Sequence, residues 1–414
     1  MNSNELMTLG LGLTPPWGVS SSSFEHSSEP GTLELEISAG RGATYPCPVC
    51  GRLCKAHDFK PSRWQHLNFF QHKCIISANV PRVKCPVHGV HKINEPWARA
   101  NSGFTLLCEQ AILLLCREMP VVKVAEITGI NDTRIWRIIT HYVSKSLEKI
   151  DLSNVYGLGV DETACKRGHN YVTVFVDMDR DTRPVIFATP GKGKETFTEF
   201  VKHLAKHGGT HENIIEVVCD MSSAFLSAVE DEFPYAAVTV DWFHVVQIFN
   251  KAVDEVRKIE AKAVKLPPSS RWAVLKATET AKTEEQQQAL KQLKKEGRET
   301  SLAFLIKEKL RWIRGADTKQ DARWRIKQFV RTARRVIAKG KYLEPMRKAL
   351  KTFEYHMEEI VSRWDSLLTN ARLESLNSLF QAVRARARGY RNVSTFITMI
   401  YLIAAPIDKL LCQK

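Results

Sequence analysis

The pattern of hydrophobic and polar positions divides the chain into stretches of different character. Residues 1–40 are rich in Ser, Gly and Glu and follow no sustained period, which predicts a disordered tail. From Gly103 a helical period runs to about Ile150. Between Val155 and Asp241, five short apolar runs predict strands, and helical stretches follow the third and fourth of them. This order predicts a mixed sheet covered by helices, an α/β fold.

The later part of the chain has a different composition. From His244 to about His356 it is charged, poor in strand signals and helical. The whole chain has 414 residues and a net charge of +15, but residues 251–360 alone carry +13 and residues 151–250 carry −7. Its length and its 44% of hydrophobic residues exclude a wholly disordered protein and suit several domains. An acidic region followed by a basic one suggests a metal centre that acts on a polyanion.

Two near-identical short motifs, Cys47-Pro-Val-Cys50-Gly51 and Cys85-Pro-Val-His88-Gly89, predict a zinc site. Each presents two ligands from one tight bend, and two such bends complete a tetrahedral Zn²⁺ site. The predicted ligands are Cys47, Cys50, Cys85 and His88. Three neighbours stay open as the fourth ligand in place of His88, namely His91, Cys54 and Cys74. No general base accompanies them, so we expect a structural zinc.

A helix-turn-helix is predicted over Val121 to Arg137. Ala125, Gly129 and Ile135 fall where this motif needs a small residue, a left-handed turn and a packed aliphatic side chain. Asn131 or Asp132 would cap the second helix. Three side chains would then face a DNA groove: Thr133, Arg134 and Arg137. Residues 51–100 carry a net +7, which also favours DNA binding, although such helix pairs occur as plain packing too.

Three carboxylates form the candidate chemical site. Asp161 and Asp220 each end an apolar run, and such side chains are either caps or metal ligands, because burying them unpaired is costly. Glu374 lies on an amphipathic helix with the apolar residues Leu373, Leu376, Leu379 and Phe380, and Asn377 follows one turn later on the same side. Four further residues are predicted to contact phosphate: Arg384, Arg386, Arg388 and Arg391.

Taken together, these motifs resemble the DDE transposases of bacterial insertion sequences, and most closely the ISL-three family. The resemblance covers about residues 45 to 405. It rests on Gly-Val-Asp161-Glu, Cys-Asp220-Met-Ser, Asp241-Trp-Phe-His244, Asn-Ala-Arg-Leu-Glu374-Ser-Leu-Asn and Arg388-Gly-Tyr-Arg-Asn392.

The resemblance implies a multidomain chain. After the tail it implies a zinc-binding, DNA-binding module over 41–100 and a helix-turn-helix over 101–150. A ribonuclease H-like catalytic core would occupy 151–250 and 361–405, interrupted by a basic helical insertion over 251–360. Asp161, Asp220 and Glu374 would be catalytic and would hold Mg²⁺ or Mn²⁺, with Asp241 and His244 as auxiliary residues.

The function implied is that of a transposase, which binds the terminal inverted repeats of its element and catalyses metal-dependent cleavage and strand transfer into target DNA. Synapsis of two ends makes a homodimer or larger assembly the expected state. Two alternatives stay open: a ribonuclease H-like nuclease without joining activity, and a catalytically dead DNA-binding regulator. The first 40 residues carry no Lys or Arg, and the late apolar run at 397–407 is short for a membrane span. We therefore expect a cytoplasmic, nucleoid-associated protein without a membrane partner.

Overall fold

The computed structural model describes residues 2–27, 29–166, 168, 170–276, 282–366, 368 and 371–406. The chain divides into two compact units, one up to Lys145 and one over Ser146–Pro406, and each is described by itself. Within the described ranges, no helix is long and apolar enough to cross a membrane.

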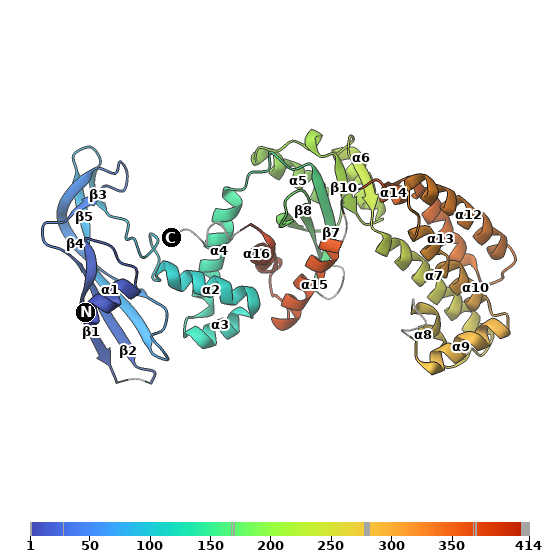
Figure 1. Ribbon diagram of the computed structural model, residues 1–414, viewed down its shortest axis with the longest axis horizontal. Helices are drawn as coiled ribbons and strands as arrows, with labels where there is room; N and C mark the ends of the chain where they lie inside the picture. The colour runs from blue at the N-terminus through green and yellow to red at the C-terminus, as the bar shows by residue number, and fades with distance from the viewer. Residues whose placement is uncertain are drawn as a thin grey trace. The chain divides into compact units, whose positions relative to one another are not determined.

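A six-stranded sheet forms most of the first unit (Figure 1). Along the sheet the order is β1-β2-β5-β4-β3, with β6 also paired to β5, and only β2 and β5 run parallel. A short helix, α1 (Ser3–Gly10), packs beside β1. The strands are β1 (Trp17–Glu25), β2 (Thr32–Ala39), β3 (Thr44–Pro46), β4 (Leu53–Gln65), β5 (Lys73–Cys85) and β6 (Gly89–Lys92).

The predicted disordered tail is wrong, because much of residues 1–40 belongs to this sheet. Leu33, Leu35 and Ile37 are buried, while Glu34 and Glu36 between them are not. This two-residue period over eight residues is the signal of a half-buried strand, and the Ser-rich composition around it concealed the pattern. The sheet also has a substantial apolar core, in which Trp17 and Trp64 contribute rings to one cluster with Ile37.

Three helices complete the first unit: α2 (Leu106–Glu118), α3 (Val121–Thr128) and α4 (Asp132–Glu148), of which α4 continues into the second unit. Gly129 ends α3 with a φ of 66°, the left-handed turn that its position predicts. The fully buried carboxylate of Glu109 on α2 accepts hydrogen bonds from Arg99, Ser102 and Tyr142. Because Tyr142 lies on α4, this carboxylate ties α2 to α4.

A five-stranded mixed sheet forms the centre of the second unit. Its order is β11-β10-β7-β8-β9; β7, β8 and β9 are antiparallel, whereas β10 and β11 run parallel to β7. Each of the five predicted apolar runs overlaps a strand. The strands are β7 (Gly157–Lys166), β8 (Asn170–Asp177), β9 (Val185–Pro190), β10 (Glu216–Cys219) and β11 (Ala237–Val240). The accompanying helices are α5 (Glu195–Lys206), η1 (His211–Asn213), α6 (Ser223–Glu232), α15 (Ala371–Arg386) and α16 (Val393–Ala404).

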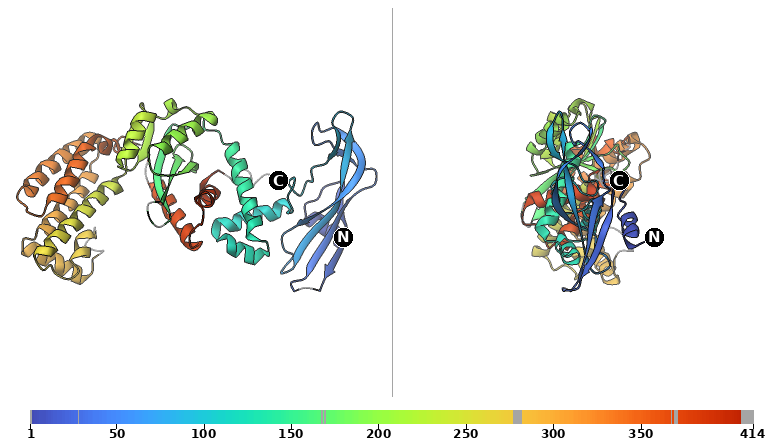
Figure 2. Two further views of the ribbon diagram at one scale, coloured as in Figure 1. Left: turned by 180° about the vertical axis from the view of Figure 1, so that it is seen from behind. Right: turned by 90° about the vertical axis from the view of Figure 1, so that its left-hand side faces the viewer.

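Between β11 and α15 the described chain is helical, and Figures 1 and 2 show these helices packed together. The first of them, α7 (Trp242–Ala263), runs without interruption from the sheet into the helical region, so the boundary expected at residue 250 does not coincide with a break. The others are α8 (Ser270–Leu275), α9 (Glu284–Lys295), α10 (Glu299–Glu308), α11 (Leu310–Arg314), α12 (Lys319–Ile337), α13 (Glu344–Tyr355) and α14 (Met357–Ser362).

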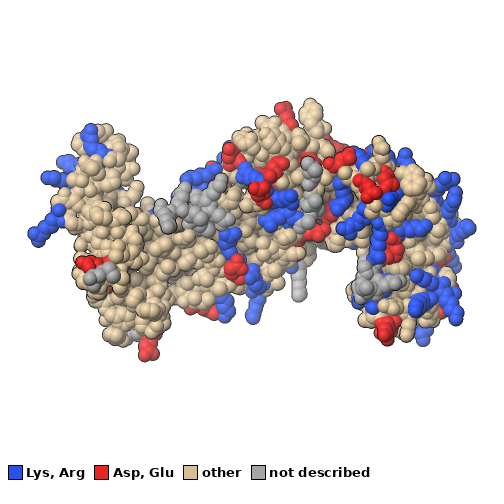
Figure 3. Space-filling view, viewed as in Figure 1, with Lys and Arg blue, Asp and Glu red and all other residues tan. Residues whose placement is uncertain are grey.

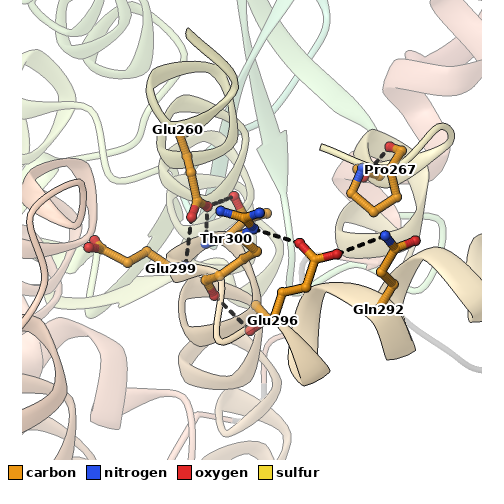
Figure 4. A network of polar contacts seen from close by, with 9 residues as sticks. Glu260, Pro267, Gln292, Glu296, Glu299 and Thr300 are labelled. Atoms are coloured by element: carbon orange, nitrogen blue, oxygen red, sulfur yellow. Dashed lines mark hydrogen bonds and ion pairs between the residues drawn. The ribbon is translucent and has the colours of Figure 1, made fainter. Parts of the chain in front are cut away.

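Two glutamates hold this helical region together through backbone N–H groups, and Figure 4 shows the bonds to the first of them, Glu260. Glu260, buried on α7, accepts hydrogen bonds from the backbone N–H groups of Glu299 and Thr300 and from the Thr300 hydroxyl, at 2.6–3.0 Å. A carboxylate at a helix N-terminus accepts hydrogen bonds from the free N–H donors and interacts favourably with the positive end of the helix dipole. Glu299 in turn accepts from the N–H groups of Lys341 and Tyr342.

We predict that Glu260→Ala destabilises the helical region. The substitution leaves three donors at the start of α10 without their acceptor, so the free energy of unfolding should fall by about 2–4 kcal/mol. Urea unfolding followed by circular dichroism, with limited proteolysis of residues 242–366, measures the effect. Glu255→Ala removes an exposed carboxylate from the same helix and serves as the control. Equal stability of the two variants would contradict the capping role of Glu260.

Candidate functional site

The two Cys-rich bends meet in the first unit and form a metal-ligand cluster. Cys47 and Cys50 lie in the turn between β3 and β4, whereas Cys85 is the last residue of β5 and His88 lies in the turn before β6. The ligand atoms of these four residues all lie within 4.8 Å of one another. Gly51 and Gly89 follow them with φ values of 72° and 80°, which residues with a Cβ rarely adopt.

The distances between the ligand atoms suit tetrahedral zinc. The Cys50 Sγ–Cys85 Sγ distance is 3.7 Å, and the Cys85 Sγ–His88 Nδ1 distance is 3.6 Å. Ligands about 2.0–2.3 Å from a tetrahedral ion are themselves roughly 3.6–3.8 Å apart. The backbone N–H groups of Val87 and His88 lower the pKa of the Cys85 thiol to about 6, which favours the thiolate that binds zinc. The residues present therefore fit a structural zinc.

The three alternative fourth ligands have other surroundings. Cys74 is buried in an apolar cluster with Leu33 and Leu35, and burial raises the pKa of its thiol to about 11. The His91 ring donates a hydrogen bond from Nε2 to the His88 carbonyl, at 2.7 Å. Cys54 lies outside the group of four ligand atoms. His88 is therefore the fourth ligand that the geometry favours.

The predicted DNA-facing residues lie at the start of α4. Asn131 accepts a hydrogen bond from the Thr133 N–H, at 2.9 Å, as a helix cap. Thr133, Arg134 and Arg137 are all exposed. The Arg134 guanidinium lies over the ring of Phe104, 4.2 Å from its centroid, so its position is held by a cation–π contact.

Strand register aligns three aspartates at one end of the second sheet. β10 lies between β7 and β11, with Val218 paired to Gly159 and Cys219 paired to Val240. Asp220 directly follows β10 and Asp241 directly follows β11, and in the same register Asp161 lies beside Asp220. Neighbouring strands are about 4.8 Å apart, so the backbone of Asp220 lies close to the backbones of Asp161 and Asp241 on either side.

Asp161 is not the last residue of its strand, contrary to the sequence expectation. Its pairing with β10 stops at Gly159, but its pairing with β8 continues as far as Lys166. The polar residues from Asp161 onward, which suggested the end of a strand, thus form the second half of β7, where β10 is no longer paired with it. That half is contacted by α15.

Helix α15 is bonded to this half of β7 through a row of polar side chains. Asn377 Nδ2 donates to Asp161 Oδ2, at 2.6 Å, and to the Glu162 carbonyl, at 3.1 Å. One turn further on, Gln381 donates to the Thr163 hydroxyl, at 2.7 Å. These roles of Asn377 and Gln381 were not predicted from the sequence. Their spacing of four residues, on the same side as Glu374, is the signal that could have identified them.

Arg384 extends the same row and was predicted to contact DNA phosphate. In the structure its guanidinium donates to the Ala164 carbonyl, at 2.8 Å, and the side chain is partly exposed, so its contact with phosphate stays a prediction. The other predicted phosphate contacts are exposed: Arg386, Arg388 and Arg391. Arg384 therefore fastens α15 to β7, which sequence periodicity alone does not reveal.

Glu374 lies on α15 one turn before Asn377, with an exposed side chain. In the described part of the chain, the zinc cluster is the only group of three or more potential ligand residues whose atoms lie within 4.8 Å of one another, so Glu374 does not meet Asp161 and Asp220 that closely. Leu379 of the predicted apolar face is exposed, whereas Leu373, Leu376 and Phe380 are buried. Thr369 and Asn370, at the start of the predicted Glu374 motif, lie outside the described residues.

The acidic groups around Asp161 perturb one another. Burial raises the pKa of Asp161 to about 6, and the charges of Asp220 and Asp241 act in the same direction, while His244 opposes them. Burial and Asp220 raise the pKa of the neighbouring Glu162 to about 7. Such a cluster favours a bound cation, and its carboxylate oxygens are the donors that Mg²⁺ prefers.

Asp241 has two different oxygen environments. Oδ1 caps α7 by accepting from the Phe243 N–H, at 3.0 Å. Oδ2 is buried without a hydrogen-bond partner among the described residues, and it lies 3.9 Å from His244 Nε2. Asp241 thus joins the capping of α7 to the acidic cluster, and His244 lies one turn into the same helix.

Comparison with known proteins identifies the family. Residues 158–400, more than half of the chain, match the family model described as a transposase, that of the ISL3 DDE transposases. The chain belongs to the ISL3 transposase family. Upstream, residues 96–143 match the helix-turn-helix domain of transposase family ISL3, which confirms the predicted motif. Residues 44–88 match the zinc-finger of transposase IS204/IS1001/IS1096/IS1165, a range that begins before Cys47 and ends at His88.

Curated relatives agree with this assignment. The chain is 26% identical over 401 residues to the transposase for insertion sequence element IS1557 of Mycobacterium tuberculosis, with 87% of this chain and 85% of the relative covered. It is 24% identical over 374 residues to the transposase for insertion sequence element IS1001 of Bordetella parapertussis, with 86% and 87% covered. The protein is therefore similar to these transposases over nearly their whole length.

We predict that the transposase contains one zinc per chain and that His88→Ala abolishes its retention. Loss of one tetrahedral ligand should also lower the melting temperature of the first unit, because zinc binding contributes folding free energy. Metal analysis after gel filtration and a thermal scan measure both effects. Cys54→Ser is the matched control and should keep the zinc. Zinc lost from Cys54→Ser and kept by His88→Ala would reverse the ligand assignment.

A second prediction concerns pH. The pKa of Asp161 is about 6 in the folded chain, above its value of about 3.9 in an unfolded chain. The folded state therefore binds more protons between these values, and the ionisation of Asp161 lowers stability as pH rises from about 4 to beyond 6. In buffer without Mg²⁺, Asp161→Asn should raise the thermal midpoint at pH 7.5 relative to the unsubstituted protein. At pH 4 the two should unfold alike.

The control for this measurement is Asp181→Asn, which changes an exposed carboxylate between β8 and β9. Its effect on the thermal midpoint should be small and similar at both pH values. A midpoint difference for Asp161→Asn that does not change with pH would argue against the raised pKa.

Proposed function

We propose that the second unit is a ribonuclease H-like core that catalyses metal-dependent DNA strand cleavage and strand transfer. The sheet supports this fold, because three antiparallel strands are followed by two strands that run parallel to the first. Helices surround the sheet, and the helical insertion precedes the last two of them, α15 and α16. Asp161 lies on the first strand and Asp220 follows the fourth. The two aspartates are thus carried by neighbouring strands of the sheet, Asp161 within β7 and Asp220 directly after β10.

The observation that carries the proposal is the bond between Asn377 and Asp161, which holds α15 against the acidic end of the sheet. Glu374 lies one turn from Asn377 on the same helix, and its exposed side chain would turn toward the two aspartates when a metal ion binds. Asp161, Asp220 and Glu374 would hold Mg²⁺ or Mn²⁺ through carboxylate oxygens. Metal ions held there would supply activation of the attacking hydroxyl and stabilisation of the leaving 3′ oxygen of the DNA strand.

The neighbouring residues would prepare the site for this chemistry. Asn377 donates to Oδ2 of Asp161, and the Glu162 N–H donates to Oδ1, at 2.7 Å. Both oxygens are thereby oriented, and each would keep a lone pair for a metal ion. Asp241 caps α7 and keeps His244 beside the acidic cluster, where the imidazole would orient a phosphate oxygen. These auxiliary roles need no change of backbone, since both side chains already lie at the first turn of α7.

The zinc module and the helix-turn-helix would bind the terminal inverted repeats, with Thr133 and Arg137 toward base edges of the major groove. Figure 3 shows many Lys and Arg side chains on the surface of the helical insertion, in agreement with its charge of +13. This surface and the exposed arginines Arg386, Arg388 and Arg391 would contact element and target phosphates. Joining two element ends requires two catalytic units, so we infer a homodimer or a larger synaptic assembly, acting on DNA in the bacterial cytoplasm.

The test is a Mg²⁺-dependent cleavage and joining reaction on labelled element-end DNA. We expect Glu374→Gln to lower strand cleavage by about 10³-fold, because one ligand of the metal ions loses its charge. DNA binding, measured by mobility shift on the same fragment, should be retained. Glu344→Gln, an exposed glutamate of α13, is the control and should cleave normally.

Each alternative gives a different result in this assay. Cleavage without joining on any DNA end would identify a nuclease rather than a transposase. Binding to the ends with no cleavage in Mg²⁺ or Mn²⁺ would indicate a regulator. Normal cleavage by Glu374→Gln would mean that another carboxylate, with Glu162 as the first to examine, completes the site.

A further inference from the structure

The hairpin that joins β4 to β5 ends in an unusual turn. Phe69 and His72 pair across it through two backbone hydrogen bonds, of 2.9 and 3.0 Å, which leaves Phe70 and Gln71 as a two-residue turn. Phe70 has a φ of 53°. This left-handed position normally holds Asn, Asp or Gly, because a bulky side chain strains the backbone there.

The ring of Phe70 receives little contact in return. Phe70 is 82% exposed and Phe69 is 37% exposed, and the two rings meet edge to face with centroids 4.7 Å apart. Neither ring belongs to the apolar clusters found among the described residues of the first unit. Phe70 therefore strains the backbone and exposes an aromatic surface, and neither effect favours folding. A strained, exposed residue of this kind indicates a function outside the fold.

The base of this hairpin lies beside the helix-turn-helix. The Gln65 N–H donates to the Gly103 carbonyl, and the Gln65 carbonyl accepts from Thr105, which caps α2. Lys73, at the start of β5, approaches the turn of the motif, where its Cε would lie 3.6 Å from a Cβ on Gly129. The end of the hairpin and the turn that precedes α4 therefore lie near each other within the first unit.

We propose that Phe69 and Phe70 form an apolar wedge that contacts DNA bases beside the site of the helix-turn-helix. Exposed phenylalanines at the end of a β-ribbon can enter a groove and open a base step. The inference rests on the proposed binding of element ends by the helix-turn-helix, and it adds a second contact to the same duplex.

Charge favours DNA over a second copy of the chain as the occupant. Residues 51–100, which include the hairpin, carry a net +7, and the whole chain carries +15. A polyanion is attracted to this surface, whereas a second copy is repelled. Two phenylalanine rings also offer far less than the roughly 800 Å² per partner of a stable protein interface.

The experiment uses the full-length protein and element-end DNA that carries 2-aminopurine at successive steps flanking the helix-turn-helix footprint. Binding of the unsubstituted protein should raise the fluorescence at one step, because the base loses its stacking. Phe70→Gly should abolish that rise and weaken binding about tenfold. Glycine suits the φ of 53°, so the variant should be at least as stable as the original. Phe59→Ala, which removes an exposed phenylalanine from β4 of the same sheet, should leave both signals unchanged.

The outcomes separate this inference from the proposed function. If the unsubstituted protein does not bind element ends, the proposed function fails. If it binds them and Phe70→Gly binds equally with the same fluorescence, only the wedge is overturned. If Phe70→Gly loses self-association in sedimentation velocity but keeps DNA affinity, the hairpin joins two copies and the wedge is again overturned.

Discussion

The candidate site depends on one constraint: β10 ends while β7 continues. Beyond Gly159, β7 is paired with β8 on one edge only, because β10 no longer runs along the other edge. The carbonyl and side-chain acceptors of β7 on that open edge need other hydrogen-bond donors. Helix α15 supplies them through Asn377, Gln381 and Arg384. As a result a helix more than 200 residues away in sequence is held against Asp161, and Glu374 comes with it. The helical insertion lies between these two elements in sequence without separating them in the fold.

Electrostatics explains why the same place suits a metal ion. Asp161, Asp220 and Asp241 lie close together because β10 and β11 end side by side, in register with Asp161 on the neighbouring strand β7. Burial and mutual repulsion raise the pKa of Asp161, so the fold stores an unfavourable interaction that a cation relieves. Glu260 shows the opposite case, since a buried carboxylate with three N–H or O–H donors is stabilised and needs no metal.

The first unit combines two ways of stabilising a DNA-binding surface. Its sheet has an apolar core with Trp17 and Trp64, and the zinc ligands hold the two bends at the ends of β3 and β5. Buried Glu109 then ties α2 to α4, the second helix of the helix-turn-helix. With these supports, a strained turn at Phe70 can be tolerated, because the long strands on both sides determine its geometry.

The sequence by itself determined the family, the zinc knuckles, the helix-turn-helix and the five strands of the second sheet, because each depends on local spacing of a few residue types. It was wrong about residues 1–40, where a short two-residue period was hidden in a polar composition. Only the tertiary structure decided that Asp161 lies within a strand, that Arg384 binds a backbone carbonyl and that Asn377 contacts Asp161. These facts depend on which strand stops first and which distant helix fills the gap. The spacing of Asn377 and Gln381 marks one side of a helix, but it does not say which strand that side contacts.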